Sequence, residues 1–229
     1  MTVLVIAPHP DDETLGCGGT IASMTAASVD VYVIAVVCHD ANTGDHGAGR
    51  RADRSSEFSE ACKALGVAGC EIVLSPGVHH TLHGQQAELV SMFESGCRYA
   101  IDVVRPDVVL IPAAGAYHQD HQVVHHAALA ACRPRGVGCH TPSNVLGYYG
   151  PEDEWRSQPK VTPAFFDISP TRERKVEALR RYELQLRRPP HPRSLETITA
   201  VDTVNGARFG VEAAEVFTPY RLDLAALLT

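Results

Sequence analysis

Uninterrupted aliphatic runs alternate with amphipathic stretches along most of this chain. The first run, VLVIA at residues 3–7, contains no polar residue, which is typical of a strand buried on both faces of a parallel sheet. Similar runs predict further strands at residues 30–38, 71–74, 107–111, 145–149 and 164–168. Helical periodicity in the intervals predicts helices at residues 14–27, 51–65, 86–104, 122–132, 170–186 and 195–204. The sequence beyond residue 204 carries no pattern that predicts an element.

The alternation of strands and helices indicates successive βαβ units. We therefore predict a single α/β domain over residues 1–229, with a doubly wound, Rossmann-like, mostly parallel sheet and helices on both faces. In the common strand order 3-2-1-4, the first and fourth strands are neighbours at the point where the winding reverses. Ligands bind there, beyond the carboxyl ends of the strands. The residues that follow these two strands are therefore the first candidates for chemistry.

The first predicted strand runs directly into the acidic segment PHPDDE, residues 8–13. Its two prolines end the strand and place His9, Asp11 and Asp12 just beyond it. In one interpretation the carboxylates only stabilise the N-terminus of a helix that begins near Thr14, and His9 is a loop residue. In the other, His9 and Asp12 bind a divalent metal ion while Asp11 remains free to act as a base.

A second cluster, HQDH at residues 118–121, follows the fourth predicted strand. If the two strands are neighbours, both clusters face one crevice, and His9, Asp12 and His121 form a two-histidine, one-carboxylate set with an open position. This set is typical of a catalytic zinc ion, although iron(II), cobalt or nickel would also suit it. The alternative is that Asp120 merely caps the following helix and both histidines of the cluster lie on the surface.

The metal interpretation assigns roles to the remaining residues of both clusters. Asp11 would take a proton from the attacking water, while His118, oriented or charged by Asp120, would stabilise the oxyanion and protonate a leaving amine. A rival H-x-x-x-H pair of His121 and His125 is disfavoured, because the glutamate of H-E-x-x-H is absent and the first cluster would have no role. Weaker candidates for substrate contact are the histidines at positions 39, 46, 79, 80 and 83.

Composition narrows the class of protein. The net charge of −7 and the lack of a basic run argue against a nucleic-acid partner. Seven scattered cysteines with no C-x-x-C pair indicate reduced thiols, and no apolar stretch reaches membrane-spanning length, so we expect a cytoplasmic protein without a membrane partner. The glycines at positions 16, 18 and 19 would allow close helix packing but lack the spacing of G-x-G-x-x-G. The sequence leaves open whether the chain forms a homo-oligomer.

PHPDDE and HQDH resemble the A-H-P-D-D-E and H-x-D-H signatures of the PIG-L/LmbE-like family of zinc-dependent N-deacetylases. Three later segments extend the resemblance over most of the chain: residues 54–57 are similar to its R-x-x-E helix, residues 167–185 to its D-I-S and K-x-x-A-L…S-Q segment, and residues 214–217 to its A-E-x-F ending. Pro8 in place of alanine, Leu184 in place of serine and a loop without aspartate after the third strand depart from the family pattern.

The resemblance implies zinc ligands at His9, Asp12 and His121, a base at Asp11 and a polarising pair at His118 and Asp120. It also implies that Arg54 contacts substrate, although a solvated arginine paired with a helix glutamate is an equal alternative. Tyr117 is a further candidate for holding the carbonyl oxygen.

The activity expected from this resemblance is zinc-dependent removal of an N-acetyl group from a small N-acetylglucosamine-type molecule, such as an amino-sugar conjugate or an antibiotic or thiol precursor. Acetate and a free amine would be released. Two alternatives remain: an amidase that cleaves a larger amide conjugate in the same site, and a sugar-binding protein that keeps the fold without turnover. Because loops carry specificity, and because this chain departs from the family pattern at the positions above, the substrate is the least constrained expectation.

Overall fold

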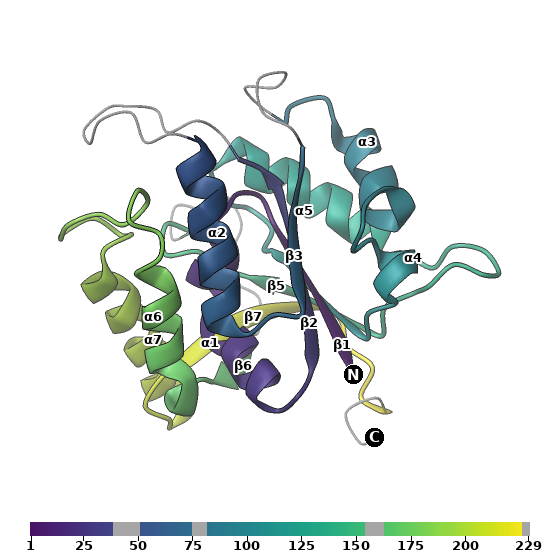
Figure 1. The fold of residues 1–229 in the computed structure, drawn as a ribbon. Helices are drawn as coiled ribbons and strands as arrows, with labels where there is room; N and C mark the ends of the chain where they lie inside the picture. Colours follow the sequence, from purple (N-terminus) through teal and green to yellow (C-terminus); the bar gives the residue numbers. More distant parts are fainter. Residues whose placement is uncertain (39–50, 75–81, 154–162, 226–229) are drawn as a thin grey trace.

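One mixed sheet forms the centre of the molecule (Figure 1). Among the residues that the computed structural model describes, 1–38, 51–74, 82–153 and 163–225, seven strands pair in the order β3-β2-β1-β4-β5-β7-β6. Six of them run parallel, and β7 is antiparallel to both of its neighbours. The predicted order 3-2-1-4 and the α/β class are confirmed. The strands are β1 (Thr2–Ala7), β2 (Asp30–Val37), β3 (Gly69–Leu74), β4 (Val108–Pro112), β5 (Asn144–Tyr148), β6 (Ala164–Asp167) and β7 (Ala214–Arg221).

Helices cover both faces of the sheet, as predicted, because alternate aliphatic residues of β1 point to opposite sides. Val3 and Val5 pack with α1 (Asp12–Ala26), α2 (Arg51–Leu65) and α6 (Arg172–Leu179), whereas Leu4 and Ile6 pack with α3 (Gln86–Ser91), α4 (Ile101–Val104) and α5 (Gln119–Ala131). The last helix, α7 (Leu195–Phe209), packs beside β7. No helix in the described part of the chain is long and apolar enough to cross a lipid bilayer.

Helix α1, which begins at Asp12, lies unusually close to the sheet. A Cβ atom at Gly16 would overlap the ring of Tyr148, a buried side chain on β5 whose hydroxyl donates to Ile6 O at 3.0 Å. The glycine is therefore required by close packing, as the sequence indicated. Immediately after it the helix is kinked, since Cys17 has non-helical dihedral angles (φ −147°, ψ 22°).

Glu215 on β7 accepts hydrogen bonds from the backbone of the second half of α1. Its carboxylate receives Gly19 N at 2.9 Å and Thr20 N at 2.7 Å, and it lies 2.8 Å from Lys175 Nζ. Backbone N–H groups freed by a kink need such an acceptor, so this buried carboxylate acts as the cap of a new helical start. The C-terminal strand, which the sequence pattern did not predict, thereby stabilises the N-terminal helix.

Two predicted helices are shorter than expected because tertiary contacts interrupt them. The predicted helix 86–104 is divided into α3, a π-helical turn (Met92–Gly96) and α4, with Cys97 in extended conformation. Tyr99, which follows this break, stacks on Tyr32 of the sheet at 5.0 Å and donates its N–H to Glu71. The predicted helix 170–186 starts as a 3-10 turn (Ser169–Thr171) and α6 ends at Leu179.

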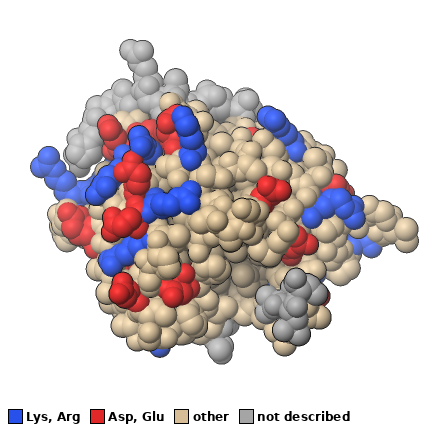
Figure 2. Space-filling model, turned by 60° about the horizontal axis from the view of Figure 1, so that its bottom comes forward, with Lys and Arg blue, Asp and Glu red and all other residues tan. Residues whose placement is uncertain are grey.

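Charged side chains of both signs are interspersed on one side of the face shown in Figure 2, and the described residues in its centre are largely uncharged. One exposed ion pair joins Glu177 on α6 to Arg181, which follows the end of that helix. Exposed pairs in water contribute little to stability. The described residues of this face form no extended basic patch.

Candidate metal centre

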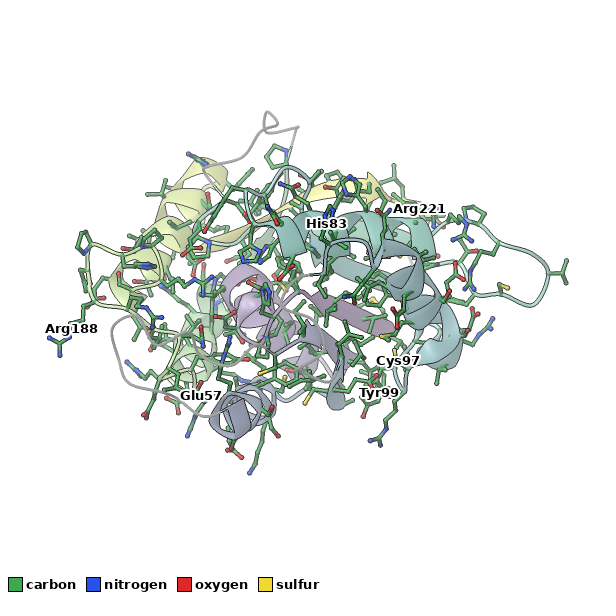
Figure 3. All side chains as sticks on the ribbon, turned by 90° about the horizontal axis from the view of Figure 1, so that it is seen from above. Glu57, His83, Cys97, Tyr99, Arg188 and Arg221 are labelled. Carbon is green, nitrogen blue, oxygen red and sulfur yellow. The ribbon has the colours of Figure 1, made fainter. Side chains whose placement is uncertain are left out.

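Two motifs that are more than a hundred residues apart in the sequence meet at the carboxyl ends of β1 and β4. His9 follows β1, Asp12 begins α1, and His121 lies in the first turn of α5. Asp12 Oδ2 is 3.3 Å from His9 Nδ1 and 3.2 Å from His121 Nε2. One donor atom from each of the three residues lies within 4.8 Å of the others. Figure 3 looks down on this edge of the sheet.

The three side chains fit a divalent metal ion. His121 Nε2 is buried and has no hydrogen-bond partner in the described part of the chain, although a carboxylate oxygen lies close to it. An imidazole nitrogen in this state suits coordination. Ligands of a tetrahedral zinc ion, each bound at roughly 2.0–2.2 Å, are about 3.3–3.5 Å apart, which matches the two separations from Asp12. The imidazole neighbours hold the pKa of Asp12 well below its usual value despite burial, so the residue supplies a negative charge.

Asp120 contacts His9, which is a different partner from the one that the sequence predicted. Asp120 Oδ2 lies 3.0 Å from His9 Nε2, and Oδ1 accepts the backbone N–H of Leu82 at 3.0 Å. A carboxylate on the far nitrogen of a metal-binding histidine fixes the tautomer and the orientation of the ring. Burial lowers the pKa of His9, but the hydrogen bonds to Asp12 and Asp120 outweigh this and raise it to about 9. The carboxylates of Asp12 and Asp120 therefore favour a positive charge at the His9 ring.

His118 caps the N-terminus of α5. Its Nδ1 accepts the backbone N–H of Asp120 at 3.2 Å. The predicted contact between these two residues therefore involves the backbone of Asp120. Burial, together with the neighbouring imidazoles of His9 and His121, lowers the pKa of His118 to about 4. The ring is consequently neutral at pH 7, and since Nδ1 is an acceptor, the ring proton resides on Nε2. Of the two roles expected for Asp120, orienting His118 or charging it, the low pKa of the ring favours the first.

Asp11 is held beside the three candidate ligands in a strained backbone conformation. Its φ of 116° is rare for a residue other than glycine, and the carboxylate of Glu13 accepts its backbone N–H at 3.2 Å. Tyr182 donates to that same buried carboxylate at 2.6 Å. Arg193 Nη1 is 3.3 Å from Asp11 Oδ2. Burial raises the pKa of Asp11 to about 6, even though the charge of Arg193 opposes the shift.

Arg54 is buried, so it is not the solvated arginine of the alternative interpretation. The Gln185 amide, with its oxygen turned toward the guanidinium, accepts from Arg54 Nε at 2.7 Å and from Nη2 at 3.2 Å. The positive charge of Arg54 also lowers the pKa of Asp11, which places the two side chains in one electrostatic environment. The chain turns after α6 to bring Tyr182 and Gln185 to this position.

Tyr117 lies at the mouth of the cleft that leads to the candidate metal centre. Its side chain is 47% exposed, and its hydroxyl donates to Glu152 Oε2 at 2.9 Å. Glu152 also accepts from Arg193 Nε at 3.0 Å. A short polar chain thus runs from the cleft mouth to Asp11. The cleft is lined by Asp12, Leu15, Tyr117, His118, His121, Gly150, Pro151, Glu152, Asp153 and Arg193.

Sequence reasoning missed Glu152, Arg193 and the backbone of Leu82. Arg193 follows the proline-rich segment 189–192, which the pattern indicated only as a rigid connector. The one local signal for Arg193 is its position directly before Ser194, the residue whose side chain caps α7. Glu152 and Leu82 lie in irregular segments, where no periodicity indicates which way a residue points.

The other histidines have different surroundings. His125 is buried, its Nδ1 lies 2.9 Å from Pro112 O, and it belongs to neither candidate metal-binding group of the described residues. His126 on the same helix and His83, labelled in Figure 3 in the segment before α3, are exposed. The candidates at positions 39, 46, 79 and 80 lie outside the described residues.

Two kinds of relatives match the chain in sequence. A deacetylase of Escherichia coli (strain K12), called YaiS and labelled uncharacterized, is 34% identical over 151 residues, which cover 64% of this chain and 77% of that protein. The 1D-myo-inositol 2-acetamido-2-deoxy-alpha-D-glucopyranoside deacetylase of Mycobacterium leprae (strain Br4923) is 27% identical over 186 residues, covering 72% of this chain. The match spans only 58% of the mycobacterial protein.

Two solved structures share the whole fold. The conserved protein TT1542 from Thermus thermophilus superposes with a TM-score of 0.73 at 25% identity, covering 97% of this chain and 95% of that one. GalB, a 4-carboxy-2-hydroxymuconate hydratase from Pseudomonas putida KT2440, gives a TM-score of 0.74 at 18% identity, covering 97% of each. The second likeness concerns the fold alone, since one fold can host different reactions.

The family model described as GlcNAc-PI de-N-acetylase matches residues 4–132, a span that contains every candidate metal ligand discussed above. This is more than half of the 229 residues. The chain therefore belongs to the PIG-L family.

Proposed function

We propose that this protein removes the N-acetyl group from a small amino sugar or amino-sugar conjugate, in a reaction that requires a divalent metal ion, best suited by zinc. The observation that supports this most directly is the set of His9, Asp12 and His121, with Asp11 beside it. His121 Nε2 is buried 3.2 Å from Asp12 Oδ2 and makes no hydrogen bond in the described part of the chain. The curated relatives named as deacetylases of a 2-acetamido sugar favour the same chemistry. The reaction adds water across the amide C–N bond and yields acetate and a free amine.

His9, Asp12 and His121 would hold the ion. When bound there, it would supply Lewis acidity to the substrate carbonyl and make water more acidic. Because Asp120 contacts His9 Nε2, coordination would fall to His9 Nδ1, the ring nitrogen that lies 3.3 Å from Asp12 Oδ2.

Asp11 would act as the general base. A pKa of about 6 leaves most of the carboxylate ionised at pH 7 and is still high enough for proton transfer from water. Arg193 and Glu13 would position it, one on the carboxylate and the other on the backbone N–H. The proton that Asp11 accepts can then pass to the amine nitrogen as the C–N bond breaks.

His118 would stabilise the oxyanion as a neutral donor. With Nδ1 occupied by a backbone N–H, the Nε2 proton is available for the negative charge that develops on the carbonyl oxygen. The low pKa of this ring means that it donates a hydrogen bond rather than a full proton at neutral pH. The proposed substrate contacts are Arg54, a buried residue whose charge acts on Asp11, and Tyr117, which lines the cleft.

The decisive assay measures acetate release from N-acetylglucosamine and its simple glycosides, with zinc-loaded protein, with chelator and after zinc is restored. We expect turnover that chelator abolishes and zinc restores. Asp11→Asn should lower kcat by at least about 100-fold, in the range for a positioned acid or base, without loss of bound metal. The matched control is Asp30→Asn, an exposed aspartate at the opposite end of the sheet, which should leave kcat unchanged.

Each result has a clear alternative. If Asp11→Asn keeps wild-type activity, Asp11 is not the general base. Cleavage of larger N-acyl conjugates without acetate release would support the amidase alternative, and glycoside binding without any hydrolysis would support a binding protein.

A further inference from the structure

A second cavity opens beside the metal cleft, under α7. It has a volume of about 180 Å³, which is comparable with the roughly 150 Å³ engineered cavities that hold a benzene molecule. Its walls come from α1, α7, β7 and the segment that follows β5. Much of the lining is apolar and includes Leu15, Ile198, Val201 and Phe209. We call this space the α7 cavity.

The α7 cavity adjoins the metal cleft. Leu15, Gly150, Pro151 and Asp153 line both spaces, so the two share one wall on the first turn of α1 and another after β5. Leu15 lies three residues from Asp12, on the same helix as this candidate metal ligand. A molecule bound at the metal centre could therefore extend past Leu15 into the α7 cavity.

Asp202, a residue of this lining, has one buried carboxylate oxygen without a hydrogen-bond partner in the described part of the chain. Lys175 Nζ lies 2.9 Å from Asp202 Oδ1 and 2.8 Å from Glu215 Oε1, so one cation faces two carboxylates. Asp202 Oδ2 makes no hydrogen bond among the described residues, although the side chain is only 6% exposed. An unsatisfied buried acceptor is costly in a folded protein, and a ligand that donates a hydrogen bond removes that cost.

From these observations we propose that the α7 cavity binds the non-reacting part of the substrate, an apolar aglycone that carries a hydroxyl group able to donate to Asp202. The inference rests on the proposed deacetylation, because it names the substrate class of that same site. An acetyl group is too small to account for the cavity, whereas the aglycone of an amino-sugar glycoside would have both the size and the position. The proposed substrate is thus an N-acetylated sugar that carries an apolar substituent, rather than an N-acetylated sugar alone.

The test compares kcat/KM for three N-acetylglucosamine glycosides: methyl, hexyl and 6-hydroxyhexyl. Each buried methylene contributes about fourfold to binding, so burial of even two or more predicts a preference for hexyl over methyl of at least tenfold. The comparison uses kcat/KM because binding energy remote from the amide can lower KM, raise kcat or do both. Equal kcat/KM values for hexyl and methyl would overturn the proposal.

The hydroxyl group tests the role of Asp202. In a wholly apolar cavity, burying a hydroxyl would reduce kcat/KM by roughly tenfold or more relative to hexyl. If Asp202 accepts a hydrogen bond from the aglycone hydroxyl, the 6-hydroxyhexyl glycoside should be used at least as well as the hexyl glycoside. A loss of tenfold or more would refute the assignment of Asp202 as the acceptor for the aglycone.

Two matched variants on α7 locate the effect. Val201→Trp would fill the α7 cavity and should bring the hexyl-to-methyl ratio close to one. Val204→Trp, one helical turn further and more exposed at 54%, lies outside the cavity and should leave the ratio at its wild-type value. If both variants change the ratio alike, or neither does, the cavity does not bind the aglycone.

A binding arm separates this inference from the proposed reaction. Calorimetric titration with hexyl β-glucoside, which has no acetamide, measures binding whether or not the protein turns over any substrate. Binding that is lost in Val201→Trp and kept in Val204→Trp would support the cavity even if no acetate is released. Equal affinity of wild type and both variants for this probe would overturn it, independently of the deacetylase result.

Discussion

The contact between Asp120 and His9 makes a sharp prediction for the variant Asp120→Asn. The wild-type carboxylate accepts from His9 Nε2 and from Leu82 N, both at 3.0 Å. An asparagine has only one oxygen, so it can satisfy one of these donors and must turn its NH₂ group toward the other. If the amide oxygen stays on Leu82, then His9 must accept at Nε2, and its proton moves to Nδ1, the proposed ligand atom. If the oxygen turns to His9, two N–H groups face each other at Leu82.

Either arrangement weakens the metal site. Loss of an outer partner of a ligating histidine costs 10–100-fold in metal affinity, equivalent to about 1.4–2.7 kcal/mol. The second arrangement also leaves the backbone N–H of Leu82 unsatisfied, at about 1–3 kcal/mol of folding stability. We therefore expect zinc affinity to fall at least tenfold in Asp120→Asn, while kcat of the fully zinc-loaded variant falls less.

Competition against a chromophoric chelator measures the zinc dissociation constant directly. The matched control is Asp102→Asn on α4, because Asp102 also forms short hydrogen bonds, to Arg135 and to His140, but belongs to neither candidate metal-binding group of the described residues. Its zinc affinity should equal that of the wild type. An Asp120→Asn variant that binds zinc within twofold of wild type would refute the assignment of Asp120 as the residue that orients His9.

Three further outcomes follow from packing, buried charge and metal binding. Gly16→Ala should lower the free energy of unfolding by about 1–3 kcal/mol, because the new methyl group displaces the Tyr148 ring. The control is Gly136→Ala, where no atom lies within 4 Å of the added Cβ, and it should change stability by less than about 0.5 kcal/mol. Urea unfolding measures both variants. Lys175→Met should cost about 3–5 kcal/mol, since it leaves two buried carboxylates without their cation, and the exposed Lys63→Met is its control in the same assay. Zinc at 100 times its dissociation constant should stabilise the wild type by about 2.7 kcal/mol and raise its unfolding temperature by roughly 5–10 °C, a shift that should be absent in His121→Ala if this residue is a ligand.

The fold was largely predictable because its signals are local. Uninterrupted aliphatic runs identified the parallel strands, and their alternation with helices implied the order that brings β1 beside β4. The same reasoning predicted that the residues after these strands would meet, and the distances from Asp12 to His9 and His121 agree. The chemical roles of these residues stay predictions.

The remaining features depend on contacts that no local pattern encodes. The early end of α6 serves to place Tyr182 on Glu13, a contact between residues far apart in the sequence. Strand β7 was not predicted because it contains Pro219, which disfavours a strand, yet it pairs with β5 across a register shift next to that residue. The partner of Asp120 could not be predicted either, since a helix places its backbone N–H on His118 while its carboxylate points elsewhere.

The capping of α1 by Glu215 has a consequence for how the protein is made. A ribosome that has synthesised the first 200 residues has already released both histidine motifs, but not the carboxylate that completes the helix beginning at Asp12. Until Glu215 has also emerged, the second half of this helix therefore lacks the acceptor for Gly19 N and Thr20 N. Completion of the first helix would thus be coupled to docking of β7, a strand that is synthesised long after it.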